Sequence, residues 1–204
     1  MTVVSVCIPT VPARESLLTR AVWSAQRFAG VEVLVAPGDR PMGDKLNEMF
    51  ARASGRMVVA LDDDDMLIGD WRTAIQLAGE YAPDFIGWRV LWTEDGRYAG
   101  SVAHRHGGDE SWSTLERGVS PKCAVATEIA RSVPFGNDYT ADRPWSKAVR
   151  GQVGSAAFVD DHLYHYDHWN AHMVGTSPDD ARYTNVQRYV GMWPVNEERI
   201  TWVV

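Results

Sequence analysis

The first 61 residues alternate between short apolar runs and longer amphipathic stretches. Three runs have the length and apolar composition of buried strands, namely 3–8, 31–36 and 56–61. The stretches between them, 13–28 and 43–53, place apolar side chains at helical spacing, and Gly30 and Gly55 follow their ends. This order of elements predicts a βαβαβ unit, in which parallel strands form a sheet with helices on its faces.

Four consecutive aspartates, Asp62–Asp65, follow the third predicted strand directly. Adjacent carboxylates repel one another unless a cation neutralises them, and a divalent ion with oxygen ligands does this well. In an open α/β sheet, phosphate-bearing ligands bind at the carboxyl ends of the strands, where this run lies. The alternative is a solvated acidic turn. Apolar residues resume at once at 66–68, which favours the metal site.

Bulk composition limits the class of protein. A chain of 204 residues with 45% apolar and 23% charged residues is typical of one globular domain. A net charge of −7 argues against binding to a nucleic-acid backbone. No apolar stretch approaches the roughly 18–20 residues that span a membrane. Cys7 and Cys123 lie in apolar surroundings, which predicts buried thiols in a reducing compartment. We therefore expect a cytoplasmic protein, in the host cytoplasm if its source is a virus.

The second half of the chain is less regular. Its predicted elements are helices at 71–81, 141–149 and 178–190, strands at 84–92, 98–104, 156–159 and 163–166, a turn at 94–97, and a short apolar segment at 121–127. The glycine pair Gly107-Gly108 indicates a mobile loop at 104–112. Such a mixture of antiparallel strands and loops suits a substrate-binding region built on the N-terminal unit.

Several short motifs follow one another across most of the chain. They are Val4–Thr10, Lys45-Leu46-Asn47 with Ala51, Ala53 and Gly55, Leu61–Asp65, Ala141–Trp145 with Arg150 and Gly151, and Leu163–Tyr166. Their order and spacing resemble the family 2 glycosyltransferases of GT-A fold, whose signatures include L-D-x-D-D and E-D-x-x-L. The resemblance implies a GT-A (Rossmann-like) α/β fold with a mixed sheet in one domain, 1–204. A parallel nucleotide-sugar-binding half, 1–92, would precede a smaller half, 93–204, that binds the acceptor and carries the catalytic base.

The resemblance implies a metal-dependent hexosyl- or pentosyltransferase that uses a nucleotide-diphospho-sugar, with UDP- or GDP-sugars as the expected donors. Asp64 would bind a divalent ion, Mn²⁺ or Mg²⁺, between the donor phosphates, and Asp62 would lie near the ribose or the metal's waters. A metal stabilises the charge that develops on a diphosphate leaving group. His165 and His168, from a cluster of four histidines, are the candidates for further ligands. A single histidine is more often an ordinary polar partner.

The resemblance also indicates residues that contact the nucleotide. These are Pro9, Thr10, Arg14, Asp39, Lys45, Asn47 and Asp63. Asp39 would contact the base, although Pro-Gly-Asp is equally typical of a simple turn. Lys45 stands where the family often has arginine, so it would meet phosphate as a point charge. Arg14 and Asn47 are equally explained as surface residues of their helices.

Asp142 is the candidate general base. An inverting transfer needs a carboxylate that takes the proton from the acceptor hydroxyl as it attacks the anomeric carbon. The family's usual glutamate before this aspartate is Ala141 here. Asp138 is a nearby rival, and a carboxylate at a helix start is also explained by the helix dipole.

Two other functions remain open. A nucleotidyltransferase of related fold usually has a glycine-rich basic loop after its first strand, whereas the loop 9–14 contains no glycine. A non-catalytic carbohydrate-binding or assembly protein is the other alternative, and the intact aspartate run argues against it. The acceptor class is also open: a saccharide, a protein or a modified nucleic-acid base are the alternatives.

Overall fold

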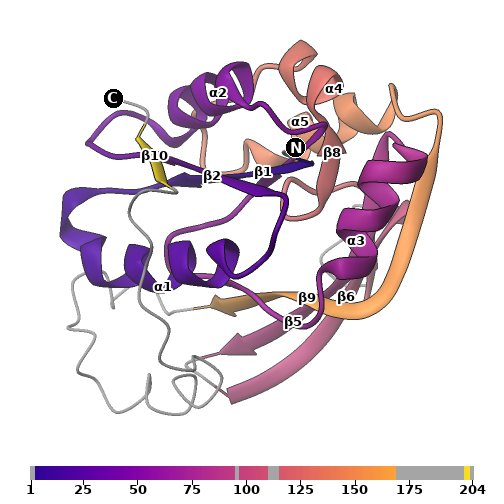
Figure 1. Ribbon diagram of the computed structural model, residues 1–204, viewed down its shortest axis with the longest axis horizontal. Helices are drawn as coiled ribbons and strands as arrows, with labels where there is room; N and C mark the ends of the chain where they lie inside the picture. The colour runs from indigo at the N-terminus through magenta and orange to yellow at the C-terminus, as the bar shows by residue number, and fades with distance from the viewer. Residues whose placement is uncertain (1–2, 95–96, 110–114, 169–199, 203–204) are drawn as a thin grey trace.

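The computed structural model describes residues 3–94, 97–109, 115–168 and 200–202 (Figure 1). Its first elements are β1 (Val4–Pro9), a 3₁₀ turn (Pro12–Arg14), α1 (Glu15–Gln26), β2 (Val31–Ala36), α2 (Met42–Arg52), β3 (Met57–Ala60) and β4 (Met66–Leu67). They are followed by α3 (Arg72–Gln76), β5 (Phe85–Glu94), β6 (Arg97–Asp109), β7 (Glu116–Arg117), β8 (Ala124–Ala126), α4 (Thr127–Ser132), α5 (Asp142–Arg150), β9 (Ala156–His168) and β10 (Ile200–Trp202).

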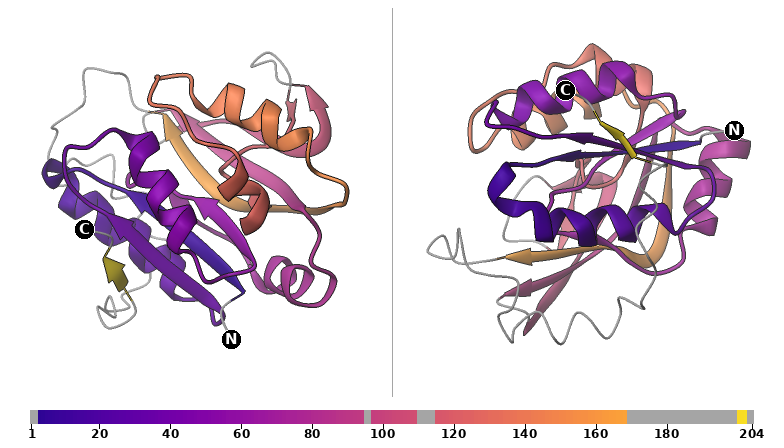
Figure 2. Two further views of the ribbon diagram at one scale, coloured as in Figure 1. Left: turned by 90° about the horizontal axis from the view of Figure 1, so that it is seen from above. Right: turned by 60° about the vertical axis from the view of Figure 1, so that its left-hand side comes forward.

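The N-terminal elements form the predicted βαβαβ unit. Strand β1 lies between β2 and β3 and is parallel to both, with Val6 opposite Val33 on one side and Val59 on the other. All residues of β1 and β3 are buried, as expected for strands covered on both faces. Helix α1 covers one face of this part of the sheet and α2 covers the other (Figures 1 and 2).

The rest of the sheet is mixed. Its strand order is β10-β2-β1-β3-β8-β5-β6-β7, and β9 pairs with both β5 and β4. Strand β8 is antiparallel to β3 and β5, β6 is antiparallel to β5, and β9 is parallel to β5. The structure therefore confirms the predicted α/β class, with a mixed sheet whose N-terminal part is parallel.

Three elements differ from the prediction in their geometry or their length. Residues 71–81 form α3 and then one π-helical turn, Leu77–Tyr81, which ends at Ala82 in the left-handed region with φ 46°. Strand β6 continues to Asp109, where a loop was expected. Gly108 lies so close to β7 that a Cβ would overlap the Arg117 carbonyl oxygen, so the glycine serves strand pairing.

Strand β9 is continuous where two short strands were expected. It pairs with β5 along its whole length. Register shifts between Trp88 and Val90 of β5 accommodate the residues of β9 that have no partner in β5. The long pairing places the predicted tyrosine-rich segment 163–166 beside β4, directly after the acidic run. The helix expected at 178–190 lies outside the described residues.

Tryptophans fill much of the core. Trp71 and Trp145 are buried, and their indole nitrogens donate to Leu163 O at 2.9 Å and to Val133 O at 3.0 Å. Cys7 and Cys123 are buried free thiols, as predicted, and burial raises the pKa of both. In the described part of the chain, every helix is too short or too polar to cross a membrane.

Candidate functional site

Loops meet at the carboxyl edge of the parallel strands. The loop after β1 is tied to the end of β2, because Thr10 N donates to Ala36 O at 3.0 Å. It is tied to the acidic run after β3, because Thr10 Oγ1 donates to Asp63 Oδ2 at 2.7 Å. The structure thus brings Thr10 against the aspartates, as expected of residues that share one crevice.

Lys45 joins the first two loops from α2. Its ammonium donates to Thr10 O at 2.7 Å and to Gly38 O in the loop that follows β2. The side chain is almost wholly buried, and burial lowers its pKa. Lys45 therefore joins the loop that follows Pro9, which is buried, to the loop that contains Asp39, which is exposed.

Asn47 also makes a structural contact. Its amide nitrogen donates to Phe135 O at 2.9 Å, and its amide oxygen accepts from Phe135 N at 2.7 Å. One turn earlier in α2, a Cβ on Gly43 would overlap the carbonyl oxygen of Gly136. Together these contacts hold α2 against the segment that leads to α5, so Asn47 positions that segment and does not face the crevice in this structure.

The acidic run alternates between buried and accessible side chains. Asp63 and Asp65 have 4% and 1% of their surface exposed, whereas Asp62 and Asp64 are half-buried. A turn closed by Asp65 N and Asp62 O at 3.1 Å shapes the run. The aspartates are therefore not a solvated acidic turn, because two of the four carboxylates point into the protein.

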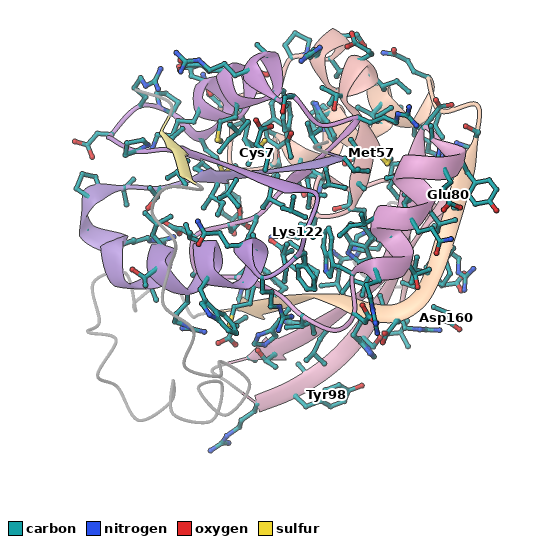
Figure 3. All side chains as sticks on the ribbon, viewed as in Figure 1. Cys7, Met57, Glu80, Tyr98, Lys122 and Asp160 are labelled. Carbon is teal, nitrogen blue, oxygen red and sulfur yellow. The ribbon has the colours of Figure 1, made fainter. Side chains whose placement is uncertain are left out.

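Lys122 binds the acidic run from the loop before β8. Its ammonium contacts Asp62 Oδ2, Asp65 Oδ2 at 2.8 Å and the Tyr164 hydroxyl at 3.1 Å. The Tyr164 hydroxyl in turn donates to Asp65 Oδ2 at 2.7 Å. The ammonium also lies 4.7 Å from the centre of the Tyr166 ring, within cation–π range. Figure 3 shows Lys122 near the centre of the molecule, beneath β1.

Sequence reasoning did not identify Lys122. The residue lies in the segment 121–127, which reads as a short apolar strand. The signal was a lone lysine in that apolar segment, since a buried charge requires a partner. Its partners are 57 and 60 residues away in the chain, so no local pattern connects them.

Arg14 binds the other side of the run. One guanidinium nitrogen donates to Asp63 Oδ1 at 2.8 Å and lies 3.6 Å from Asp64 Oδ2. The predicted candidate Arg14 therefore contacts the acidic run from the turn that precedes α1. Arg14 and Lys122 are two cations placed among four carboxylates.

Burial dominates the electrostatics of the run. Burial and then the charge of Asp62 raise the pKa of Asp64 to about 6. Burial raises the pKa of Asp65 to about 8 against the opposing charge of Lys122. Burial would lower the pKa of Lys122, but the carboxylates of Asp62 and Asp65 outweigh it and raise that pKa well above its usual range. Lys122 is thus a permanent cation.

The expected metal ligands do not form a complete divalent-ion site by themselves in this arrangement. Asp62 is bound to Lys122, and Asp64 faces Arg14. Throughout residues 3–94, 97–109, 115–168 and 200–202, no three His, Cys, Asp or Glu side chains are grouped so as to hold a metal ion. A cation is present in the place where the sequence predicted a metal, and it comes from the protein itself.

The two candidate histidines lie on opposite faces of β9. His165 is buried, its Nε2 lies 2.9 Å from Thr93 Oγ1, and burial lowers its pKa. His168 is exposed at the end of the strand, and its ring centre lies 6.1 Å from that of Tyr166. Only His168 therefore shares a face with the tyrosines that contact Lys122.

Asp142 is the first residue of α5 and is half-buried. Burial lowers the pKa of the nearby Arg117, and the charges of Asp142 and Tyr166 oppose that shift. Tyr166 also contacts Lys122, so its ring lies between the acidic run and the charge of Arg117 in electrostatic terms. The rival Asp138 is exposed in the preceding turn, where its carbonyl accepts from Ala141 N at 3.0 Å.

Comparison with known proteins identifies the fold. No protein-family model and no curated protein sequence matches the chain. Among solved structures, S. aureus TarS 1-349 is similar at 16% identity with a TM-score of 0.65, over 81% of this chain and 60% of that one. The same TarS fragment in complex with UDP-GlcNAc matches at 14% identity with a TM-score of 0.65, over 86% and 61%.

A third similar structure is glucosyl-3-phosphoglycerate synthase from Mycobacterium tuberculosis in complex with Mn²⁺, UDP and glucosyl-3-phosphoglycerate. It matches at 16% identity with a TM-score of 0.53, over 93% of this chain and 80% of that one. The chain spans about 60% of the length of the TarS fragments. At these identities the likeness shows the fold, which is that of the GT-A glycosyltransferases.

Proposed function

We propose that this protein is a glycosyltransferase that moves a sugar from a nucleoside-diphosphate sugar to an acceptor hydroxyl. The observation that carries the proposal is the joining of Thr10, Arg14 and the acidic run at the carboxyl edge of β1 and β3. In open α/β sheets this edge is the ligand-binding edge. The similar structures of this fold include complexes with UDP and UDP-GlcNAc.

The donor would lie across the first half of the chain, 1–92. Its base would rest on the two loops that Lys45 braces, near Pro9, Thr10 and Asp39. Its diphosphate would lie over Asp62 and Asp64, where cationic groups are already assembled. A UDP-sugar is the first donor to test, because UDP is the nucleotide of the similar complexes, and a GDP-sugar is the second.

The acceptor would bind in the second half, 93–204, beside α5. Asp142 would take the proton from the acceptor hydroxyl while the oxygen attacks the anomeric carbon. The bond from that carbon to the diphosphate breaks, and the nucleoside diphosphate leaves with the electron pair and an added negative charge. Attack from the face opposite the leaving group inverts the anomeric carbon.

The leaving diphosphate requires a cation. A divalent ion, Mn²⁺ as in the glucosyl-3-phosphoglycerate synthase complex or Mg²⁺, would compete with Lys122 for Asp62 or with Arg14 for Asp64. The proposal of glycosyl transfer therefore does not depend on a metal. A saccharide, a protein and a modified nucleic-acid base remain the acceptor classes to screen.

Titration calorimetry with UDP and GDP, each with EDTA and with Mn²⁺, tests the donor site. We expect one of the two nucleotides to bind, and the matching nucleotide sugars to be hydrolysed slowly without acceptor. Absence of binding under all four conditions would contradict the proposal. Release of pyrophosphate from a nucleoside triphosphate in the presence of a sugar phosphate would indicate a nucleotidyltransferase instead.

A further inference from the structure

Two ion pairs join the acidic run to cations from other segments, and in each pair a buried carboxylate binds a partly exposed cation. Asp65, whose side chain is 0% exposed, binds Lys122, which is 24% exposed. Asp63, which is 4% exposed, binds Arg14, which is 33% exposed. In each pair the carboxylate is buried and the cationic side chain is partly exposed. The two buried aspartates therefore fix the cations in place, and the cationic side chains remain partly exposed.

We infer that Lys122 and Arg14 are the groups that receive the donor diphosphate, so that the nucleotide sugar binds without a divalent ion. The inference rests on the proposed function and assigns the cation of the same site. Ammonium and guanidinium groups donate charge-assisted hydrogen bonds to phosphate oxygens, and arginine does so through two parallel N–H groups.

The backbone around Lys122 holds the ammonium in position before any ligand arrives. Ala60 N, at the end of β3, donates to Pro121 O at 2.8 Å, so the residue before Lys122 is fixed to the strand that leads into the aspartates. Cys123 N donates to Ser120 O at 3.0 Å and closes a turn around the lysine. A cation fixed by the protein stabilises a developing negative charge without reorganisation during the reaction.

Each carboxylate of the acidic run is paired with one of these two cations. Lys122 contacts both Asp62 and Asp65, which are the first and last carboxylates of the run. Arg14 contacts the two carboxylates between them. A metal at Asp62 or Asp64 would be repelled by the cation that is already paired with that carboxylate, whereas a diphosphate would be attracted by both cations.

The decisive experiment measures the dissociation constant of UDP, and of GDP in parallel, for the wild-type protein by calorimetry. One series contains EDTA, and the other contains Mn²⁺ at saturating concentration. We expect the two constants to agree within about twofold, because a fixed cation needs no metal. Binding that is lost in EDTA and restored by Mn²⁺ would overturn the inference and leave glycosyl transfer standing. Absence of nucleotide binding in both series would overturn both.

A double variant, Lys122→Met with Asp65→Asn, tests the lysine directly. It removes the cation and also the buried charge that would otherwise be left without a partner. We expect the dissociation constant in EDTA to rise about tenfold or more, which is the usual effect of losing a hydrogen bond to a charged group. Lys147→Met, at an exposed lysine of α5, is the matched control and should bind as wild type. Unchanged binding by the double variant would contradict the role of Lys122. If the double variant does not fold by circular dichroism, the wild-type EDTA series decides.

Discussion

The ammonium of Lys122 lies 2.8 Å from the fully buried carboxylate of Asp65, across 57 residues of sequence. The pair connects the loop before β8 to the end of β3. Tyr164 of β9 contacts both partners, so three segments meet at one charge pair. The contact places a cation between two carboxylates of the run, Asp62 and Asp65.

Removal of the lysine alone should destabilise the protein. Lys122→Met leaves Asp65 buried without its cation, and we expect the free energy of unfolding to fall by about 3 kcal/mol at pH 8. Chemical denaturation followed by fluorescence measures this loss. Asp65→Asn in the same background should recover part of it, because the neutral amide needs no cation. A single variant as stable as wild type would show that the pair contributes nothing.

The raised pKa of Asp64 predicts a pH-dependent stability. The carboxyl titrates near 4 in the unfolded chain and at about 6 in the folded protein. The folded state keeps the proton longer, so its stabilising contribution is full below pH 4 and is lost as the pH rises to 6. Relative to wild type, Asp64→Asn should gain about 2 kcal/mol between pH 4 and pH 7. Denaturation curves of wild type, Asp64→Asn and the exposed control Asp39→Asn, recorded across this pH range, measure the difference. The same pH dependence of stability in all three proteins would contradict the raised pKa of Asp64.

Asp142→Asn tests the general base. The amide cannot accept the acceptor proton, so we expect the transfer rate to fall by about 10² to 10⁴-fold, while UDP binding stays unchanged. Rates come from product detection by mass spectrometry, and binding comes from calorimetry. Asp138→Asn, four residues earlier in an exposed turn, should keep the wild-type rate. The opposite pattern, with Asp138 essential and Asp142 dispensable, would move the base to the turn.

Lys45→Met should loosen the nucleotide loops. The variant loses two hydrogen bonds to the carbonyls of Thr10 and Gly38 and leaves those acceptors without the ammonium. We expect a loss of about 1–3 kcal/mol in unfolding free energy and a weaker affinity for UDP. Asp44→Asn, at the preceding and more exposed position of α2, serves as the control. If Lys45→Met loses affinity for UDP but keeps the wild-type unfolding free energy, a direct contact between Lys45 and phosphate would be favoured.

Gly43→Ala tests the close packing of α2. Alanine is the better helix former, yet its Cβ would overlap the Gly136 carbonyl oxygen. We expect destabilisation of about 1–3 kcal/mol in thermal unfolding. Gly79→Ala is the matched control, since a Cβ there meets only Val3 methyl groups at 3.8 and 4.0 Å. Equal stability of the two variants would show that the segment before α5 moves aside easily.

The N-terminal half of the fold was predictable because its signals are local. Each strand and helix of the βαβαβ unit has its own periodicity, and the observed boundaries of β2 match the predicted 31–36. Parallel strands joined by helices then have few possible arrangements. The presence of the acidic run at a strand end followed from the same reasoning.

The second half and the chemistry of the run depend on contacts between distant residues. The length of β9 follows from its pairing with β5, which no window of sequence contains. Lys45 and Asn47 bind backbone atoms of Gly38 and Phe135. Every residue has these backbone atoms, so the sequence does not indicate which residue is the partner. Lys122 neutralises part of the run from a distant segment of the chain, which the local sequence around the aspartates does not indicate.

The pairing of strand β9 bears on whether residues 1–92 and 93–204 can unfold separately. Strand β9 pairs with β4 immediately after the aspartates, while β8 pairs with β3 immediately before them. Both partners come from the second half, so a fragment ending at residue 92 would lack the strands that flank the acidic run. The halves 1–92 and 93–204 should therefore unfold in one cooperative step, and neither should fold alone.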